Sequence, residues 1–244
     1  SKNPNRTELE QCLAALEGGS EALCFASGMA ATNAVIQTLA PGDHLLYPDD
    51  VYWGMRKLLS AVYDRSGLEA TPVDFTSLEA VRGAWRANTK LVWVETPSNP
   101  LLKVTDLHAI AHLAKERGAR MVCDSTFASP ILQRPFDHGV DLVMHSTTKY
   151  LGGHSDLTGG AVITKAPNEM FDRMKIAQVY AGAVPSPFDC WLALRGIATL
   201  GVRVRAQTSS AGAIAAFLSS HQAVERVHYP GLPSHPGAMF SAMQ

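Results

Sequence analysis

Three ionisable residues stand at or just beyond the ends of apolar runs that are typical of strands: Glu95, Asp124 and Lys149. An ionised carboxylate at the buried end of a strand, such as Asp124, is costly without a cationic partner, and burial raises its pKa. A protonated pyridine nitrogen is such a partner, because a carboxylate there keeps the ring cationic and able to act as an electron sink. The alternative is that Asp124 only caps the turn through Ser125 and Thr126, and the sequence favours neither role over the other.

Lys149 lies in the run HSTTKYLGGHSD, just beyond the apolar run 141–144. We expect its amine to be shielded from solvent. An amine beside a second cationic system loses its proton more readily and becomes a nucleophile toward an aldehyde. The hydroxyls of Ser146 and Thr148 flank it and can donate to a phosphate. The pattern therefore predicts an aldehyde-binding lysine beside a phosphate-binding turn.

Two further segments carry candidate ligand groups. In the run ASGMAA, Gly28 opens a turn between a strand and a helix, where a small residue lets backbone amides approach an anion. Taken alone, such a turn is more often only a helix cap, and it gains weight from Lys149. Tyr52 follows another strand, and its ring could lie on a planar cofactor while its hydroxyl serves as an acid or base.

Metal binding is not predicted. The histidines show no H-E-x-x-H spacing. His145 and His154 bracket Lys149 without a carboxylate or thiolate at metal-ligand spacing. We therefore expect no metal among the site components.

The candidate residues belong to an alternating pattern of strands and helices. Apolar runs rich in β-branched residues occur at 21–26, 43–47, 90–95, 120–124, 141–145 and 160–164. Helices are expected at 29–39, 58–63, 78–86, 107–116, 169–180, 191–200 and 202–218. The runs LVWV and MVC are apolar at consecutive positions, which indicates strands covered on both faces. The pattern predicts an α/β fold with a mainly parallel sheet flanked by helices and a ligand site at the carboxyl ends of its strands.

Composition narrows the classes of protein. The 244 residues are 46% hydrophobic and 18% charged, as in a globular protein with a sizeable core. The net charge of -1 and the scattered Lys and Arg residues predict no nucleic-acid partner. The chain has no apolar run near the roughly 20 residues that span a bilayer, which predicts a cytoplasmic protein without a membrane partner. Four cysteines without C-x-x-C spacing are expected to be reduced thiols: Cys12, Cys24, Cys123 and Cys190.

Seven runs spread over nearly the whole chain resemble the Cys/Met-metabolism pyridoxal-phosphate enzymes: NPNRTELE, FASGMAAT, VETPSNP, CDSTFASP, HSTTKYLGGHSD, GAVPSPFDCWLALRG and YPGLPSHP. This family contains cystathionine γ-synthase, cystathionine γ-lyase, cystathionine β-lyase, methionine γ-lyase and homoserine sulfhydrylases. The resemblance implies pyridoxal 5'-phosphate as the cofactor. It also implies the large domain of a fold type I, aspartate aminotransferase-like transferase.

The resemblance implies a role for each matching position around the cofactor ring. Lys149 would carry the cofactor as a Schiff base and then remove a proton from the substrate. Asp124 would pair with the pyridine nitrogen, and Thr126 would lie close to the ring. Tyr52 would stack on the ring, contact the substrate and protonate the leaving sulfur. Asn99 would contact the cofactor or the substrate.

The cofactor phosphate would be held by two segments. The resemblance implies contacts from the backbone of Gly28 and Met29 and from the hydroxyls of Ser146 and Thr148. The roles implied for Ser146 and Thr148 agree with the phosphate-binding turn predicted from the residues themselves.

The run GAVPSPFDCWLALRG is closer to the γ-lyase and γ-synthase branches than to the β-lyase branch. The resemblance therefore predicts cleavage of L-cystathionine to cysteine, 2-oxobutanoate and ammonia, or γ-replacement on an O-acylhomoserine with cysteine. Methionine γ-lyase, cystathionine β-lyase and O-acylhomoserine sulfhydrylase are the alternatives. A cofactor-free scaffold relative is the non-enzymatic alternative, and the joint presence of Lys149, Asp124, Tyr52 and Ser146 argues against it. A phosphate-binding NTPase is a weaker rival, because the chain has no G-x-x-x-x-G-K-[ST] run.

The family also implies an assembly and a domain division. We expect a homotetramer, a dimer of dimers with shared active sites, that acts on small amino-acid substrates. Residues 1–205 are expected to form the cofactor-binding large domain, with an incomplete N-terminal arm. Residues 206–244 would be a linking helix and the start of a C-terminal domain that is largely absent. The family's arginine for the substrate carboxylate and its phosphate ligands from the neighbouring subunit would then lie outside this chain.

Overall fold

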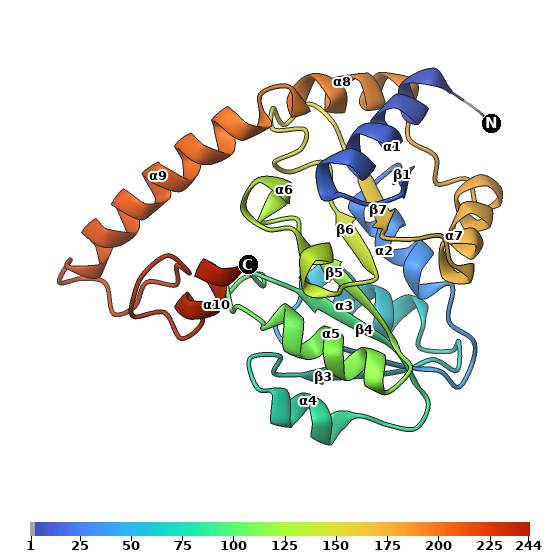
Figure 1. Ribbon diagram of the computed structural model, residues 1–244, viewed down its shortest axis with the longest axis horizontal. Helices are drawn as coiled ribbons and strands as arrows, with labels where there is room; N and C mark the ends of the chain where they lie inside the picture. The colour runs from blue at the N-terminus through green and yellow to red at the C-terminus, as the bar shows by residue number, and fades with distance from the viewer. Residues whose placement is uncertain (1–2) are drawn as a thin grey trace.

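The computed structural model describes residues 3–244 and contains one central sheet (Figure 1). Its strands are β1 (Glu21–Phe25), β2 (His44–Pro48), β3 (Glu69–Val73), β4 (Thr89–Glu95), β5 (Arg120–Asp124), β6 (Leu142–His145) and β7 (Gly160–Thr164). Their order is β1-β7-β6-β5-β4-β2-β3. Neighbours from β6 to β3 are parallel, and β7 is antiparallel to both β6 and β1. The predicted α/β fold with a mainly parallel sheet is confirmed.

Helices cover both faces of this sheet. They are α1 (Pro4–Glu17), α2 (Gly28–Ile36), α3 (Trp53–Lys57), α4 (Leu78–Ala84), α5 (Leu107–Glu116), α6 (Ser129–Leu132), α7 (Glu169–Tyr180), α8 (Pro187–Ile197), α9 (Leu200–Ser219) and α10 (Ala238–Met243), with a π-helical turn η1 (Leu58–Val62) and a 3-10 turn η2 (Pro135–His138). Helices α2, α3 and α7 pack on one face, and α1, α8, α4 and α5 pack on the other.

The consecutive apolar residues of β4 explain this two-sided packing. Successive side chains of a strand point to opposite faces. Leu91 and Trp93 lie in the cluster with α2 and α7, whereas Val92 and Val94 lie in the cluster with α5. Both sets of side chains are at most 1% exposed. The run LVWV is therefore apolar throughout because neither face of the strand meets water.

Helix α1 and strand β3 are two of the elements that lie outside the predicted segments. Helix α1 begins at a cap in which the Asn3 side chain accepts the amides of Asn5 and Arg6, with a proline at its first turn. It precedes the first strand and so lies outside the alternation of strands and helices from which the other helices were predicted. Strand β3 lies at the sheet edge and contains Pro72, a residue that removes a ladder donor and that central strands exclude.

Two predicted helix starts were wrong. The helix expected at 58–63 is preceded by α3, which begins at Trp53 and continues into η1, because Met55 and Leu59 both reach the core. The helix expected at 191–200 begins at Pro187, after a cap in which the Ser186 side chain accepts the amide of Asp189.

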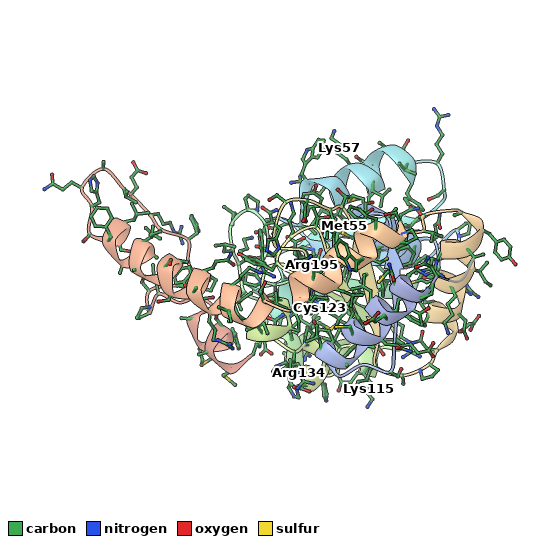
Figure 2. All side chains as sticks on the ribbon, turned by 90° about the horizontal axis from the view of Figure 1, so that it is seen from above. Met55, Lys57, Lys115, Cys123, Arg134 and Arg195 are labelled. Carbon is green, nitrogen blue, oxygen red and sulfur yellow. The ribbon has the colours of Figure 1, made fainter. Side chains whose placement is uncertain are left out.

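Helix α9 leaves the main body and carries the chain toward the C-terminal segment (Figures 1 and 2). Along its 20 residues, Leu200, Val204 and Ala215 are buried. The chain returns through α10, and Gln244 donates to the carbonyl of Thr105 at 2.8 Å. The expected domain boundary at residue 205 falls inside α9, and the division into 1–205 and 206–244 stays a prediction.

Two further features concern thiols and membranes. All four cysteines are free thiols, with Cys24, Cys123 and Cys190 buried and Cys12 half-buried. Burial raises the pKa of Cys190 to about 11. Within residues 3–244, no helix combines the length and the apolar character needed to cross a membrane.

Candidate active site

A cavity of about 440 Å³ lies where the parallel strands end. It is lined by Ser27, Gly28, Met29, Thr32, Tyr52, Glu95, Pro97, Asn99, Asp124, Thr126, Phe127, Met144, Ser146, Thr148, Lys149 and Thr158. These include every residue that was predicted to bind cofactor or substrate. Segments from six parts of the chain therefore meet at one place.

The strand register explains why these segments meet. Glu95 pairs with Asp124, and Asp124 pairs with Met144, so the ends of β4, β5 and β6 lie side by side. His145 pairs with the start of β7, and the start of β7 pairs with the end of β1. The turn before α2 therefore reaches the same edge of the sheet as the turn that carries Lys149.

The acidic end of the cavity is built on Asp124. Burial raises the pKa of its carboxyl, and hydrogen bonds from Thr126 partly oppose this rise. The Thr126 amide donates to Asp124 Oδ1 at 3.0 Å, while Thr126 Oγ1 accepts from the Ser146 amide at 2.9 Å. Thr126 thus links the strand that carries the carboxylate to the turn that carries Lys149. A desolvated carboxylate in this position favours a cationic partner.

Lys149 sits in a tight turn after β6. Its amide donates to the Ser146 carbonyl at 3.2 Å, and the Gly153 amide donates to the Lys149 carbonyl at 2.7 Å. The side chain is exposed, so the expectation of a shielded amine is wrong for this chain. The physical reason is that the lysine lies on a turn beyond the sheet edge, where the cavity is open to solvent.

The anion-binding part of the cavity lies at the start of α2. Ser27 Oγ accepts the amide of Ala30 at 3.0 Å, and the Ser27 carbonyl accepts the amide of Ala31. The amides of Gly28 and Met29 belong to the first helical turn, whose N–H groups have no partner within the helix. A Cβ on Gly28 would lie 2.9 Å from Ser146 Oγ, so only glycine allows this close approach. The turn and the Ser146 hydroxyl therefore form one cup for an anion.

Thr148 differs from its predicted role in one respect. Its hydroxyl donates to the Gly159 carbonyl at 3.2 Å and accepts from the Gly159 amide at 3.0 Å. The hydroxyl proton is therefore used within the protein. Of the two predicted hydroxyls, that of Ser146 is available to an anion in the cup, and Thr148 would have to leave Gly159 to contribute.

Tyr52 and Asn99 lie on the other side of the cavity, and both are held by Glu95. The Tyr52 side chain is 46% exposed and lines the cavity. Glu95 Oε2 accepts from the Tyr52 amide at 3.0 Å, and Oε1 accepts from the Asn99 amide at 2.7 Å. Glu95 is a strand-end residue that sequence reasoning singled out without assigning it a role.

Several lining residues were missed by the sequence analysis: Ser27, Thr32, Pro97, Phe127, Met144 and Thr158. Thr32 had an available signal, because it lies four residues after Gly28 on α2 and so faces the same side of the helix. Thr158 had no signal of its own, since it reaches the cavity only through the pairing of β7 with β1.

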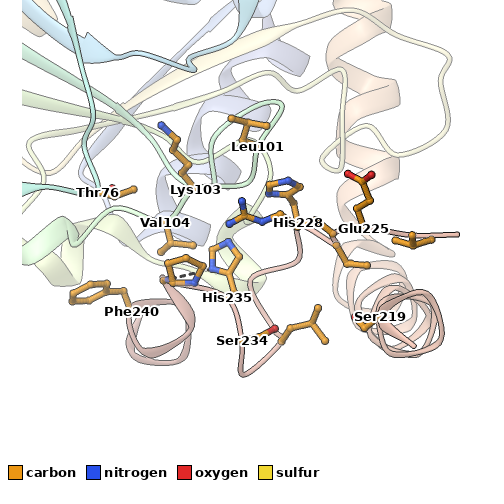
Figure 3. A pocket seen from close by; sticks show the side chains of 16 residues that line it. Thr76, Leu101, Lys103, Val104, Ser219, Glu225, His228, Ser234, His235 and Phe240 are labelled. Carbon is orange, nitrogen blue, oxygen red and sulfur yellow. Dashed lines mark hydrogen bonds between the residues drawn. The ribbon is translucent and has the colours of Figure 1, made fainter. Parts of the chain in front are cut away.

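A second cavity of about 600 Å³ lies between the segment 101–104 and the C-terminal residues (Figure 3). Basic side chains line part of it: Lys103, Arg226, His228 and His235. It contains none of the predicted site residues. In the part of the chain described, residues 3–244, no group of three or more His, Cys, Asp or Glu side chains is arranged to hold a metal ion.

Comparison with known proteins shows extensive similarity. The profile of the family described as "Cys/Met metabolism PLP-dependent enzyme" matches residues 1–244. A probable cystathionine gamma-synthase of Herpetosiphon aurantiacus is 51% identical over 234 residues, which are 96% of this chain and 73% of that protein. A cystathionine beta-lyase of Coxiella burnetii is 48% identical over 237 residues, which are 97% of this chain and 61% of that protein.

A solved structure shares the same fold. The crystal structure of cystathionine gamma-lyase from Lactobacillus plantarum, complexed with L-serine, superposes with a TM-score of 0.97 at 42% identity. The match covers 99% of this chain and 63% of that one. The chain thus spans less than two thirds of the length of the Coxiella and Lactobacillus proteins.

Proposed function

Because this chain belongs to the Cys/Met metabolism PLP-dependent enzyme family, we propose that it uses pyridoxal 5'-phosphate to transform sulfur amino acids. The reaction we propose is that of a cystathionine γ-synthase or a cystathionine γ-lyase. The observation that carries this proposal is the meeting of Lys149, Asp124 and the α2 anion cup in one cavity. A cofactor with an aldehyde, a basic ring nitrogen and a phosphate needs these three kinds of partner.

The cavity fits pyridoxal phosphate through the chemistry of its donors. We assign the phosphate to the amides of Gly28 and Met29 and to the Ser146 hydroxyl, with Thr148 as a further ligand if its hydroxyl turns from Gly159. We assign the pyridine nitrogen to Asp124, whose raised pKa reflects a carboxylate without sufficient solvation. The aldehyde falls to Lys149. When bound, pyridoxal phosphate supplies this aldehyde and a cationic ring that withdraws electrons from the substrate.

The residues of the chain would then move protons and orient the substrate. We assign Lys149 the removal of the proton from the substrate's Cα, because its amine is the basic group on the open side of the cavity. Tyr52, which lines the cavity, would lie against the cofactor ring, and its hydroxyl would supply a proton to the departing sulfur. Asn99 contacts the substrate, and Thr126 holds Asp124 in place through its amide.

The phosphate assignment predicts the effect of Gly28→Ala. The added Cβ would meet Ser146 Cβ and Oγ at 2.9 Å, so the hydroxyl must move away from the anion cup. We expect the dissociation constant for pyridoxal phosphate to rise by about tenfold, the equivalent of one charge-assisted hydrogen bond. Equilibrium dialysis measures this constant. The control is Gly83→Ala on α4, where an added Cβ meets nothing within 4 Å, and an equal rise in both variants would contradict the assignment.

Relatives at similar identity carry names from different branches of the family. The synthase and the β-lyase match this chain at 51% and 48% identity. We place the γ-reactions first because of the run GAVPSPFDCWLALRG, and β-elimination from cystathionine remains the second candidate. Methionine γ-lyase and O-acylhomoserine sulfhydrylase activities are tested by the same assays.

We further propose a homotetramer of the family type in the cytoplasm. Apolar side chains on neighbouring helices are exposed in the single chain, and they support burial against another copy: Ile176, Val179 and Tyr180 on α7, and Phe188 and Trp191 on α8. Tyr180 is 83% exposed, which is unusual for a large aromatic side chain.

Product analysis tests the reaction. The purified protein, loaded with pyridoxal phosphate, is given L-cystathionine in one assay and an O-acylhomoserine with cysteine in another. We expect 2-oxobutanoate and cysteine from the first, or cystathionine from the second. Pyruvate with homocysteine would move the protein to the β-lyase branch. A protein that stays colourless with added cofactor would overturn the enzymatic proposal in favour of a scaffold.

A further inference from the structure

Glu95 ends β4 beside Asp124 and is only 5% exposed. It lines the cavity, yet the proposed reaction gives it no role. Burial and the neighbouring charges of Asp124 and Asp50 raise its pKa, and the hydrogen bonds from the Tyr52 and Asn99 amides oppose this rise. A second carboxyl beside Asp124 therefore costs stability that an apolar residue would not cost.

Each oxygen of Glu95 is used by a different segment. Oε2 accepts the amide of Tyr52, which stands just before α3, at 3.0 Å. Oε1 accepts the amide of Asn99, which lies in the loop between β4 and α5, at 2.7 Å. The two segments thus meet at one carboxylate, although Tyr52 and Glu95 are 43 residues apart in the chain.

Other contacts join the same two segments farther from the cavity. Ser98 Oγ donates to Asp50, and Lys103 Nζ lies 2.9 Å from Asp49 Oδ1. Neither Asp49, Asp50, Ser98 nor Lys103 lines the cavity. These contacts keep the segments adjacent. Glu95 is the contact that acts on the two cavity-lining residues themselves.

We propose that Glu95 is a positioning residue, whose carboxylate holds the Tyr52 and Asn99 segments as one unit facing the substrate. The substrate contacts of Tyr52 and Asn99 rest on the function proposed above, but the mechanical coupling does not. A buried amide that loses its acceptor changes a local equilibrium about tenfold. Loss of the carboxylate should therefore loosen both segments at the cavity and leave the distant fold intact.

Hydrogen–deuterium exchange of the Tyr52 and Asn99 amides tests the coupling without any reaction. In Glu95→Gln, one side-chain position becomes an NH2 group that cannot accept a hydrogen bond, so at least one of the two amides should exchange about tenfold faster. Glu95→Asp keeps the charge but shortens the reach, so it should also accelerate exchange. Native protection of both amides in folded Glu95→Gln would overturn the proposal. Native protection in Glu95→Asp together with loss in Glu95→Gln would support the carboxylate as the group that holds both amides, with enough slack for the shorter side chain to reach them.

Glu10→Gln is the matched control. Glu10 is a carboxyl whose pKa is also raised by burial, and it accepts the Cys24 amide and the Gln178 side chain. None of these three residues lines the cavity. Both hydrogen bonds go to Oε1, and glutamine keeps one acceptor oxygen, so this variant should leave the Cys24, Tyr52 and Asn99 amides at their native exchange rates.

Kinetics separates the positioning role from the proposed function. In the protein loaded with pyridoxal phosphate, Glu95→Gln should lower kcat/KM for the substrate about tenfold to hundredfold. The dissociation constant of the cofactor should change less than about threefold, because the residues assigned to its phosphate, ring nitrogen and aldehyde do not include Glu95 and only the Tyr52 stacking contact depends on it. A native kcat/KM despite faster exchange would overturn the catalytic consequence. Absence of turnover in the unmodified protein would instead overturn the proposed function, and the exchange result would still stand.

Discussion

In Lys149→Ala, kcat should fall at least about 10³-fold, within the range for loss of a proton-transferring side chain. The amine is the proposed attachment point of the cofactor and the proposed base, so one substitution removes both roles. Its turn is held by backbone hydrogen bonds from Lys149 to Ser146 and from Gly153 to Lys149, which alanine retains. The variant should therefore fold normally, and its circular dichroism spectrum should match that of the native protein.

Detection of the covalent bond between Lys149 and the cofactor is a more specific test than the loss of activity. Native protein treated with pyridoxal phosphate and borohydride should gain one cofactor mass on the peptide that contains Lys149, and the variant should not. Lys165→Ala is the matched control, because Lys165 lies beyond β7, over the ring of Phe136 and outside this cavity. Cofactor mass on another lysine, or native turnover by Lys149→Ala, would refute the central assignment.

Asp124→Asn should lower kcat about 100-fold or more, because a neutral amide no longer favours a protonated ring nitrogen. Asparagine keeps the oxygen that accepts the Thr126 amide, so the local geometry survives. Asp141→Asn is the control. Asp141 accepts the Met121 amide near the starts of β5 and β6, at the end of these strands away from Asp124. A native rate in Asp124→Asn would exclude the proposed pairing with the ring.

Although Asp124→Asn should lower activity, the same substitution should increase the free energy of unfolding of the protein without cofactor. Burial raises the pKa of Asp124 above that of the unfolded chain, roughly 3.9 for an aspartate. The folded state therefore binds more protons than the unfolded state between these two pKa values, and stability falls as the pH rises through that window. Asparagine removes this loss, so urea denaturation at neutral pH should show a higher midpoint for Asp124→Asn than for the native protein. Equal midpoints would mean that Asp124 is adequately solvated or paired.

The sequence predicted the parts of the site that local pattern determines. Consecutive apolar residues located β4 and β5, and with them Glu95 and Asp124 at the strand ends. The small residue at Gly28 and the hydroxyls around Lys149 marked the anion cup. The convergence of these pieces followed from one rule, that parallel strands end at the same sheet edge.

Other features depended on contacts between distant segments and left no local signal. The hydrogen bonds from the Tyr52 and Asn99 amides to Glu95 require the folded positions of three segments: the end of β4, the start of α3 and the loop after β4. Thr148 gives its hydroxyl to Gly159, a residue in a loop that closes only when β6 and β7 pair. The exposure of Lys149 depends on how far the cavity opens, which residue types do not encode.

The antiparallel strand β7 also constrains the order in which a growing polypeptide can fold. Strand β1 joins the sheet through β7, and Ser20 contacts Thr164 across 144 residues of sequence. During synthesis, β1 can therefore join the sheet only after β7, residues 160–164, has left the ribosome. The Gly28 turn is synthesised early, but the anion cup forms only after Ser146 and β7 have followed. Until β7 pairs with β1, the apolar side chains of β1 are candidates for chaperone binding.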